Sequence, residues 1–116
     1  MSKSALIVVD IQNDYFPGGK WPLVGADAAA DNAAKIIQAT RNSNGLVVHI
    51  RHEFTREDAP FFTPNSEGAK LHPKVINQGE ESVILKHFPN SFRETGLKAL
   101  LEGHGALVRP ELLTLL

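Results

Sequence analysis

The sequence has 116 residues, which is enough for one hydrophobic core and too few for two. Hydrophobic residues make up 42% and charged residues 22%, and 12 Lys and Arg against 13 Asp and Glu leave no basic surface for nucleic acid or anionic lipid. No apolar run is long enough to span a membrane, and the absence of cysteine excludes disulfides and thiolate metal sites.

The first predicted element is a strand at 5–9, where the apolar run ALIVV leads directly into Asp10. A loop rich in Pro and Gly follows, and Asp27 is expected to cap a helix that ends near Arg41. The inward face of this helix is predicted from apolar residues at helical spacing: Ala30, Ala33, Ala34 and Ile37.

Two further apolar runs predict strands at 46–51 and 82–86, and the second run ends on Lys86. Nearly continuous Val and Ile strands separated by amphipathic helices indicate an α/β fold, a three-layer α/β/α arrangement around a Rossmann-like parallel sheet. Parallel strands open at their carboxyl ends into one crevice, so Asp10 and Lys86 are expected to meet there. The two positions alone favour a functional pair and a purely structural ion pair about equally.

After residue 90, the sequence predicts a second helix and a short strand. Ser91 and Glu94 have the spacing of a capping box, with the apolar residues Leu97, Leu100 and Leu101 facing inward. The capping role accounts for Ser91 without a nucleophilic one, since no GxSxG elbow surrounds it. Because Pro110 breaks any strand, only a short fourth strand at 106–108 is expected.

The segment between 52 and 81 shows no clear helical period, and such long loops usually serve as lids or binding loops. Candidate pocket residues are Phe16, Trp21 and His52, with Phe61 and Phe62 as further loop aromatics that equally often pack on a core. His49 and His52 lie three apart in a strand and point to opposite faces, and no HExxH motif is present. The sequence therefore predicts no metal site, and without a phosphate-binding motif it predicts no cofactor.

Three blocks of this sequence, ALIVVDIQNDYFPGG, FFTPNSEGAKLHPKV and VILKHFPNSFRETGL, together resemble the isochorismatase-like cysteine hydrolase family. That family includes nicotinamidases and N-carbamoylsarcosine amidohydrolases, and the resemblance covers roughly residues 5–105. It implies the strand order 3-2-1-4-5-6, a general base at Asp10, an essential partner at Lys86, and a nucleophilic Cys after strand four. The family's metal-binding pattern is not matched by HIRHEF, the local sequence here.

The departure from the family is that this chain contains no Cys and ends in ALVRPELLTLL. We expect one isochorismatase-like domain over 1–116 that is incomplete at the C-terminus, from a truncated or frame-shifted gene product. One interpretation is a hydrolase by descent that acts on an amide or related C–N or vinyl-ether bond of a small molecule and is inactive as given. The alternative is a non-catalytic subunit with the same fold that binds a small ligand or a partner.

Two expectations about assembly and location follow. Without strands five and six, and with only a short strand four, the strand at 5–9 is expected to lose most of its pairing on one side. The tail residues Leu112, Leu113, Leu115 and Leu116 are expected to lie in a contact between chains. The chain is therefore expected to form homo-oligomers. The N-terminus lacks the features of a secretory signal, so a cytoplasmic location without nucleic-acid or membrane partners is expected.

Overall fold

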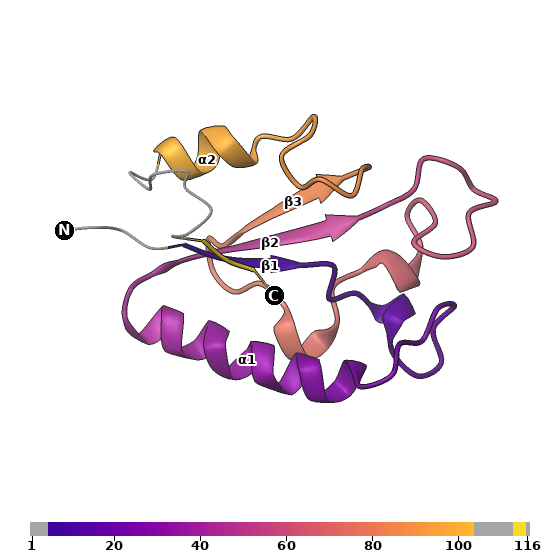
Figure 1. Cartoon of the computed structure of the whole chain (residues 1–116), viewed down its shortest axis with the longest axis horizontal. Helices are drawn as coiled ribbons and strands as arrows, with labels where there is room; N and C mark the ends of the chain where they lie inside the picture. Colours follow the sequence, from indigo (N-terminus) through magenta and orange to yellow (C-terminus); the bar gives the residue numbers. More distant parts are fainter. Residues whose placement is uncertain (1–4, 104–112, 116) are drawn as a thin grey trace.

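The computed structural model describes residues 5–103 and the backbone of residues 113–115. Four parallel strands form one sheet in the order β3-β2-β1-β4, with a helix on each face (Figure 1). This arrangement confirms the predicted α/β class. The strands and helices are β1 (Ala5–Val9), α1 (Ala26–Asn42), β2 (Leu46–His52), β3 (Ser82–Lys86), α2 (Leu97–Gly103) and β4 (Leu113–Leu115).

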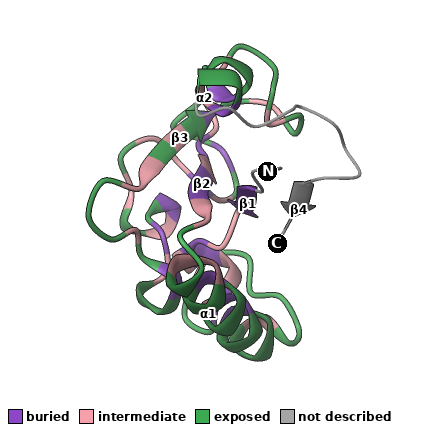
Figure 2. Cartoon of the chain, turned by 90° about the vertical axis from the view of Figure 1, so that its left-hand side faces the viewer, coloured by how far each residue is buried: buried purple, intermediate pink, exposed green. Residues whose placement is uncertain are grey.

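The sheet is buried on both faces because alternate residues of β1 and β2 serve different helices. Ala5 and Ile7 of β1 pack with Leu97 and Leu101 of α2, whereas the intervening β1 residues pack with Ala33 and others of α1. Figure 2 shows the purple buried residues between α2 above and α1 below. The continuous apolar runs in the sequence therefore reflect a strand covered on both sides.

Helix α1 has the predicted inward face but a different cap. Ala30, Ala33 and Ile37 are buried as expected. The N-cap is Gly25, which has a φ of 79°, and no side chain caps the helix there. Asp27 is not the cap but lies in the first turn, where its negative charge interacts favourably with the positive end of the helix dipole. The prediction of Asp27 as cap was wrong by two residues.

Helix α2 begins later than the capping box predicts. Ser91 and Glu94 lie in turns before the helix, and Glu94 has a φ of 54°, which is incompatible with a helical turn at that residue. The Thr95 hydroxyl instead donates to the Ser91 carbonyl at 2.6 Å and accepts from the Leu97 N–H at 3.4 Å. The capping box was therefore a wrong prediction, although Leu97 and Leu101 are buried as expected.

The neighbour of β1 on its outer side differs from the predicted one. The expected strand at 106–108 lies outside the described residues, and the slot beside β1 holds β4. Ala5, Leu6 and Ile7 pair in parallel register with Leu113, Thr114 and Leu115. The expectation that the strand at 5–9 loses most of its pairing on this side was therefore wrong, because its first three residues have partners there. Self-association of the chain stays a prediction.

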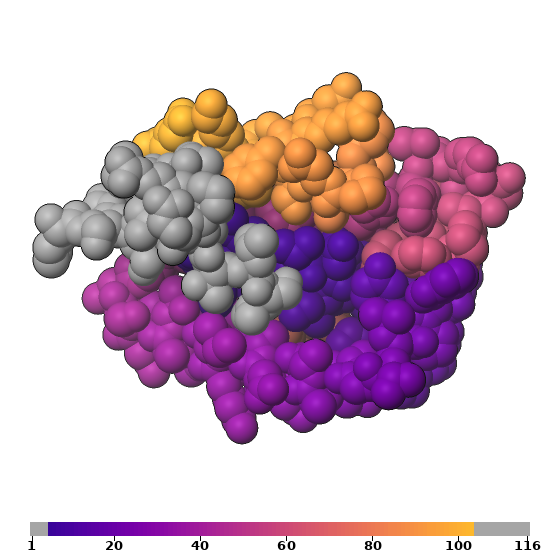
Figure 3. Space-filling view, in the orientation of Figure 1, coloured from indigo at the N-terminus to yellow at the C-terminus, as the bar shows by residue number. Residues whose placement is uncertain are grey.

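The loops after β1 and β2 lie against each other beyond the carboxyl ends of the strands. The Asn13 N–H donates to the Lys70 carbonyl and the His72 N–H to the Ile11 carbonyl, both at 3.0 Å. Figure 3 shows the indigo segment after β1 in contact with the pink segment after β2 at the right of the view. The long loop is thus an ordered cover over this edge of the sheet. None of the helices in the described part of the chain is long and apolar enough to cross a lipid bilayer.

Candidate active site

The charges that end β1 and β3 meet across the end of β2, which lies between these strands. The Lys86 ammonium is 3.4 Å from Asp10 Oδ2 and donates to the Pro89 carbonyl at 3.0 Å. The Lys86 side chain is only 2% exposed, whereas that of Asp10 is 28% exposed. The pair is therefore anchored inside the protein at the lysine and open to solvent at the carboxylate.

The main chain of Asp10 is turned out of the strand. Its φ is 61°, in the left-handed region that Asp and Asn occupy more readily than most other residues. The Asp10 N–H still donates to the Ile50 carbonyl of β2 at 3.0 Å, so the turn is fixed at the point where β1 ends. An abrupt end to an apolar strand thus places a carboxylate at the mouth of the crevice.

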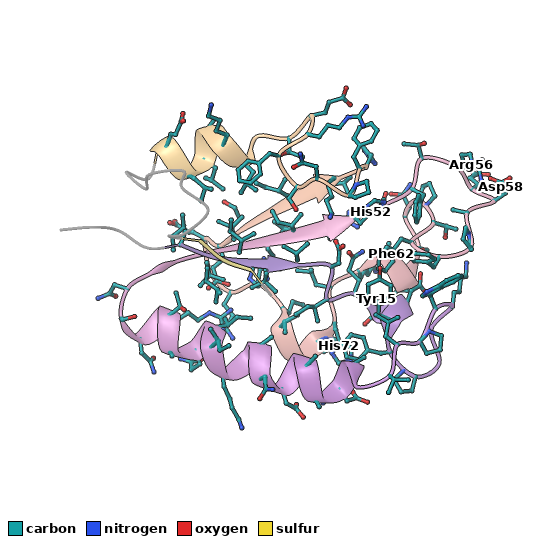
Figure 4. All side chains as sticks on the ribbon, in the orientation of Figure 1. Tyr15, His52, Arg56, Asp58, Phe62 and His72 are labelled. Atoms are coloured by element: carbon teal, nitrogen blue, oxygen red, sulfur yellow. The ribbon has the colours of Figure 1, made fainter. Side chains whose placement is uncertain are left out.

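A cavity of about 230 Å³ lies beside Asp10, and most of its wall is aromatic. Ring centroids are 4.7 Å apart for Tyr15 and Phe62, 4.9 Å for Phe61 and Phe62, and 4.6 Å for His52 and Phe54. Figure 4 shows Tyr15, His52 and Phe62 together at the carboxyl end of the sheet, whereas Arg56 and Asp58 lie at the outer tip of the loop. The lining residues are Asp10, Tyr15, His52, Phe54, Phe61, Phe62 and Pro89.

The polar atoms of this cavity are incompletely paired. Asp10 Oδ1 and His52 Nε2 are both buried, and neither has a hydrogen-bond partner among the described residues. Burial lowers the pKa of His52, as do the nearby Lys86 and His87, while Asp10 opposes the shift. Burial, reinforced by the Asp10 charge, raises the pKa of Tyr15. The site therefore combines a neutral imidazole and a neutral phenol with a paired carboxylate at neutral pH.

The predicted pocket residues are only partly brought together. His52 lines the aromatic cavity, whereas Phe16 lines a second cavity of about 210 Å³ between β1 and α1, which Asp10 also borders. The Phe16 ring stacks on His72 with ring centroids 3.8 Å apart. Trp21 lines neither cavity and is 47% exposed. Its ring contacts that of Phe61, with ring centroids 4.8 Å apart. Trp21 therefore meets the aromatic cavity only through its contact with Phe61.

Two buried polar residues next to Asp10 were missed by the sequence analysis. The Asp14 carboxylate accepts the N–H of Phe62 at 2.7 Å and of Lys20 at 3.1 Å, so it ties two loops together. Gln12 is likewise buried and bonds the main chain of His52. The available signal was the run QND at 12–14, three residues after the end of a buried strand, because polar residues at such a position are either solvated or paired inside the fold.

Comparisons with known proteins place the chain in a family. The model of the isochorismatase domain matches residues 4–107. The chain belongs to the isochorismatase family. It is 46% identical over 102 residues to the uncharacterized isochorismatase family protein YddQ of Bacillus subtilis, a match that covers 88% of this chain and 57% of that protein.

Solved structures agree with this assignment. A crystal structure of a candidate isochorismatase hydrolase from Oleispira antarctica has a TM-score of 0.89 and 47% identity, over 99% of this chain and 60% of that one. N-carbamoylsarcosine amidase from Thermoplasma acidophilum has a TM-score of 0.85 over 98% of this chain and 66% of that chain, and at 23% identity it supports the fold alone. This isochorismatase-family chain thus spans 57% of the length of YddQ and 60% of the length of the Oleispira antarctica protein.

The second buried histidine of β2 belongs to a separate cluster. His49 Nε2 lies 3.0 Å from Glu81 Oε1, and Arg41 of α1 contacts both oxygens of the same carboxylate at 2.7 and 2.8 Å. The hydrogen bond from Arg41 is the main cause that lowers the pKa of Glu81 to about 2. His49 and His52 therefore do not converge, and the described residues hold no group of three side chains placed to bind a metal ion.

Proposed function

We propose that this isochorismatase-family chain carries the acid–base half of an amide-hydrolase site and that the 116-residue polypeptide binds a small planar amide without hydrolysing it. The observation that carries the proposal is the Asp10–Lys86 pair at 3.4 Å beside an aromatic cavity. The site lies beyond the carboxyl ends of parallel strands, where α/β proteins bind their ligands. An ion pair at this place has a ligand-sized space next to it, which a purely structural pair does not require.

The polar atoms suit a carboxamide. The Asp10 carboxylate, whose side chain is 28% exposed, can accept one N–H of an amide nitrogen. The Lys86 ammonium has three donors, and its described contacts, Asp10 and the Pro89 carbonyl, account for two of them. A third donor directed at the amide oxygen would give both ends of the ligand a charge-assisted hydrogen bond.

The walls and the volume restrict the ligand class. A cavity of about 230 Å³ is smaller than the roughly 300–1,000 Å³ of pockets for drug-sized molecules, so a single ring is the natural occupant. Phe61 and Phe62 favour a flat group, since aromatic rings gain from offset or edge contacts at centroid distances of about 4.5–7 Å. An amide attached to one aromatic ring satisfies the volume, the walls and the polar atoms.

The absence of turnover follows from the absence of cysteine in this chain. In the resemblance that assigns Asp10 as general base, the group that it deprotonates is a thiol. Removing the nucleophile from a comparable catalytic triad costs on the order of a millionfold in turnover. Binding without catalysis is therefore the function that these residues support, in line with the interpretation of the chain as a ligand-binding module.

The test is a titration with benzamide, followed through the fluorescence of Trp21, the only tryptophan of the chain. This ring contacts Phe61, which lines the cavity. We expect saturable binding of benzamide and weaker binding of the non-planar cyclohexanecarboxamide. Asp10→Asn should weaken benzamide binding about 10- to 100-fold, the range for one charge-assisted hydrogen bond.

The matched control is Glu57→Gln, which removes an exposed carboxylate from the loop that carries Phe61. It should bind benzamide like the unmodified chain. Equal affinity of the Asp10→Asn variant and the unmodified chain would contradict the proposed site.

A further inference from the structure

Gln12 is completely buried two residues after Asp10, and its side chain makes three hydrogen bonds to distant main-chain groups. Its Nε2 donates to the His52 carbonyl at 2.8 Å and to the Ala69 carbonyl at 2.6 Å. Its Oε1 accepts the His52 N–H at 2.7 Å. Both amide hydrogens are therefore used, and the bonds are short and cross 40 and 57 residues of sequence.

These hydrogen bonds hold the end of β2, the strand whose last residue lines the aromatic cavity. His52 is the last residue of β2, and Gln12 holds its main chain from both the N–H and the carbonyl side. In the sheet, His52 is the register partner of Lys86, and the Glu53 N–H donates to the Lys86 carbonyl at 3.0 Å. A shift of the His52 main chain would therefore also disturb the lysine of the ion pair.

The His52 ring has no such anchor of its own. Its Nε2 has no partner among the described residues, and its closest aromatic neighbours, Phe54 and Phe62, have ring centroids 4.6 and 6.1 Å away. The orientation of a buried ring without a side-chain hydrogen bond depends on where its main chain is held and on what packs around it. In this site the main-chain restraint comes from Gln12.

We propose that Gln12 is a positioning residue, whose carboxamide fixes the end of β2 and thereby sets the His52 ring against Asp10 and the aromatic cavity. Its importance for ligand binding rests on the proposed function. The positioning itself does not, so it can be tested without any ligand.

The experiment follows the ring C–H signals of His52 and His49 by NMR through a pH titration of the unmodified chain and of Gln12→Met. Methionine has nearly the same length and volume but cannot make the three hydrogen bonds. The charged and titratable groups around His52 are Asp10, Lys86 and His87, and the substitution adds no charge to them. Gln38→Met, on the exposed face of α1, is the matched control.

In the unmodified chain and in the Gln38→Met variant, the pKa of His52 should lie below its ordinary value because the ring is buried. In Gln12→Met it should rise toward the ordinary value of about 6.5, because the released strand end lets water or Asp10 reach the ring. His49 lies in the same strand as His52 but is held by the Glu81 carboxylate, so its titration should not change. If Gln12→Met does not fold, Gln12→Asn, which is shorter by one methylene, gives the same comparison.

Two results would overturn the inference. One is a folded variant in which the His52 titration is unchanged, since the ring is then positioned without Gln12. The other is an equal change at His52 and His49, which would show a general loosening of the fold. A negative result in the benzamide titration, by contrast, concerns only the proposed function.

Discussion

The ion pair between Asp10 and Lys86 should show strong energetic coupling, which a double-mutant cycle can measure. The perturbations are Asp10→Asn, Lys86→Met and the two together. Asparagine tolerates the left-handed main chain at position 10, so the first variant removes charge without adding backbone strain. Methionine replaces the apolar stem of the lysine at similar length.

The two single substitutions should differ in cost because the partners differ in burial. Asp10→Asn leaves an ammonium that is 2% exposed with only the Pro89 carbonyl as a full partner, and we expect a loss of about 3 kcal/mol, at the lower end of the values for a broken buried pair. Lys86→Met leaves a carboxylate that is 28% exposed and accessible to water, which should cost about 1–2 kcal/mol. The double variant contains neither charge, so the coupling should be about 1–3 kcal/mol.

The assay is urea unfolding at pH 7, with the free energy of unfolding compared across the four chains. The control cycle is Glu67→Gln with Lys70→Met, a pair that is closer, at 2.6 Å, but 83% and 60% exposed. Its coupling should stay below about 0.5 kcal/mol because water screens exposed charges. Additive losses at Asp10 and Lys86, within about 0.5 kcal/mol, would refute the view that burial makes this pair strong.

Three further outcomes follow from the structure. Gly68→Ala should destabilise the fold by about 1–3 kcal/mol in thermal unfolding, because its Cβ would overlap the buried Asp14 carboxylate, whereas Gly96→Ala meets open space and should be tolerated. The pKa of Glu81 is about 2 against an ordinary 4.5, so its ionised form stabilises the fold above pH 4.5 and this stabilisation is lost as the pH falls through 2. Glu81→Gln should therefore cost about 2–3 kcal/mol at pH 7 and progressively less toward pH 2, and Glu80→Gln, at an exposed neighbour, should cost little at either pH. Sedimentation velocity at micromolar concentration should show self-association, and a monodisperse monomer would contradict that expectation.

The sheet and the charged pair could be predicted because each depends on a short-range pattern. Continuous apolar runs identify strands buried on both faces, and a charge at the end of such a run must lie at the edge of a parallel sheet. Asp10 and Lys86 were found in this way. Helix α1 was also predictable, since its apolar stripe follows the 3.6-residue period, whereas its first residue depended on the main-chain conformation of Gly25.

The walls of the cavity were harder to predict because they depend on how a long loop closes. Phe61 and Phe62 lie about fifty residues from Tyr15, and nothing in their local sequence distinguishes a pocket wall from ordinary packing. The buried roles of Gln12 and Asp14 depend on partners 40 to 57 residues away. The capping box at Ser91 had the right spacing, but Thr95 supplied the competing local hydrogen bonds.

The most direct test of the central claim is a proton NMR time course of benzamide mixed with the 116-residue chain. One spectrum reports binding, through broadening of the benzamide signals, and hydrolysis, through the signals of benzoate. The account predicts broadening that Asp10→Asn reduces, with no benzoate above a protein-free blank, because Asp10 and Lys86 form an ion pair beside the cavity and the chain contains no thiol. Accumulation of benzoate, or sharp benzamide signals at millimolar ligand, would contradict it.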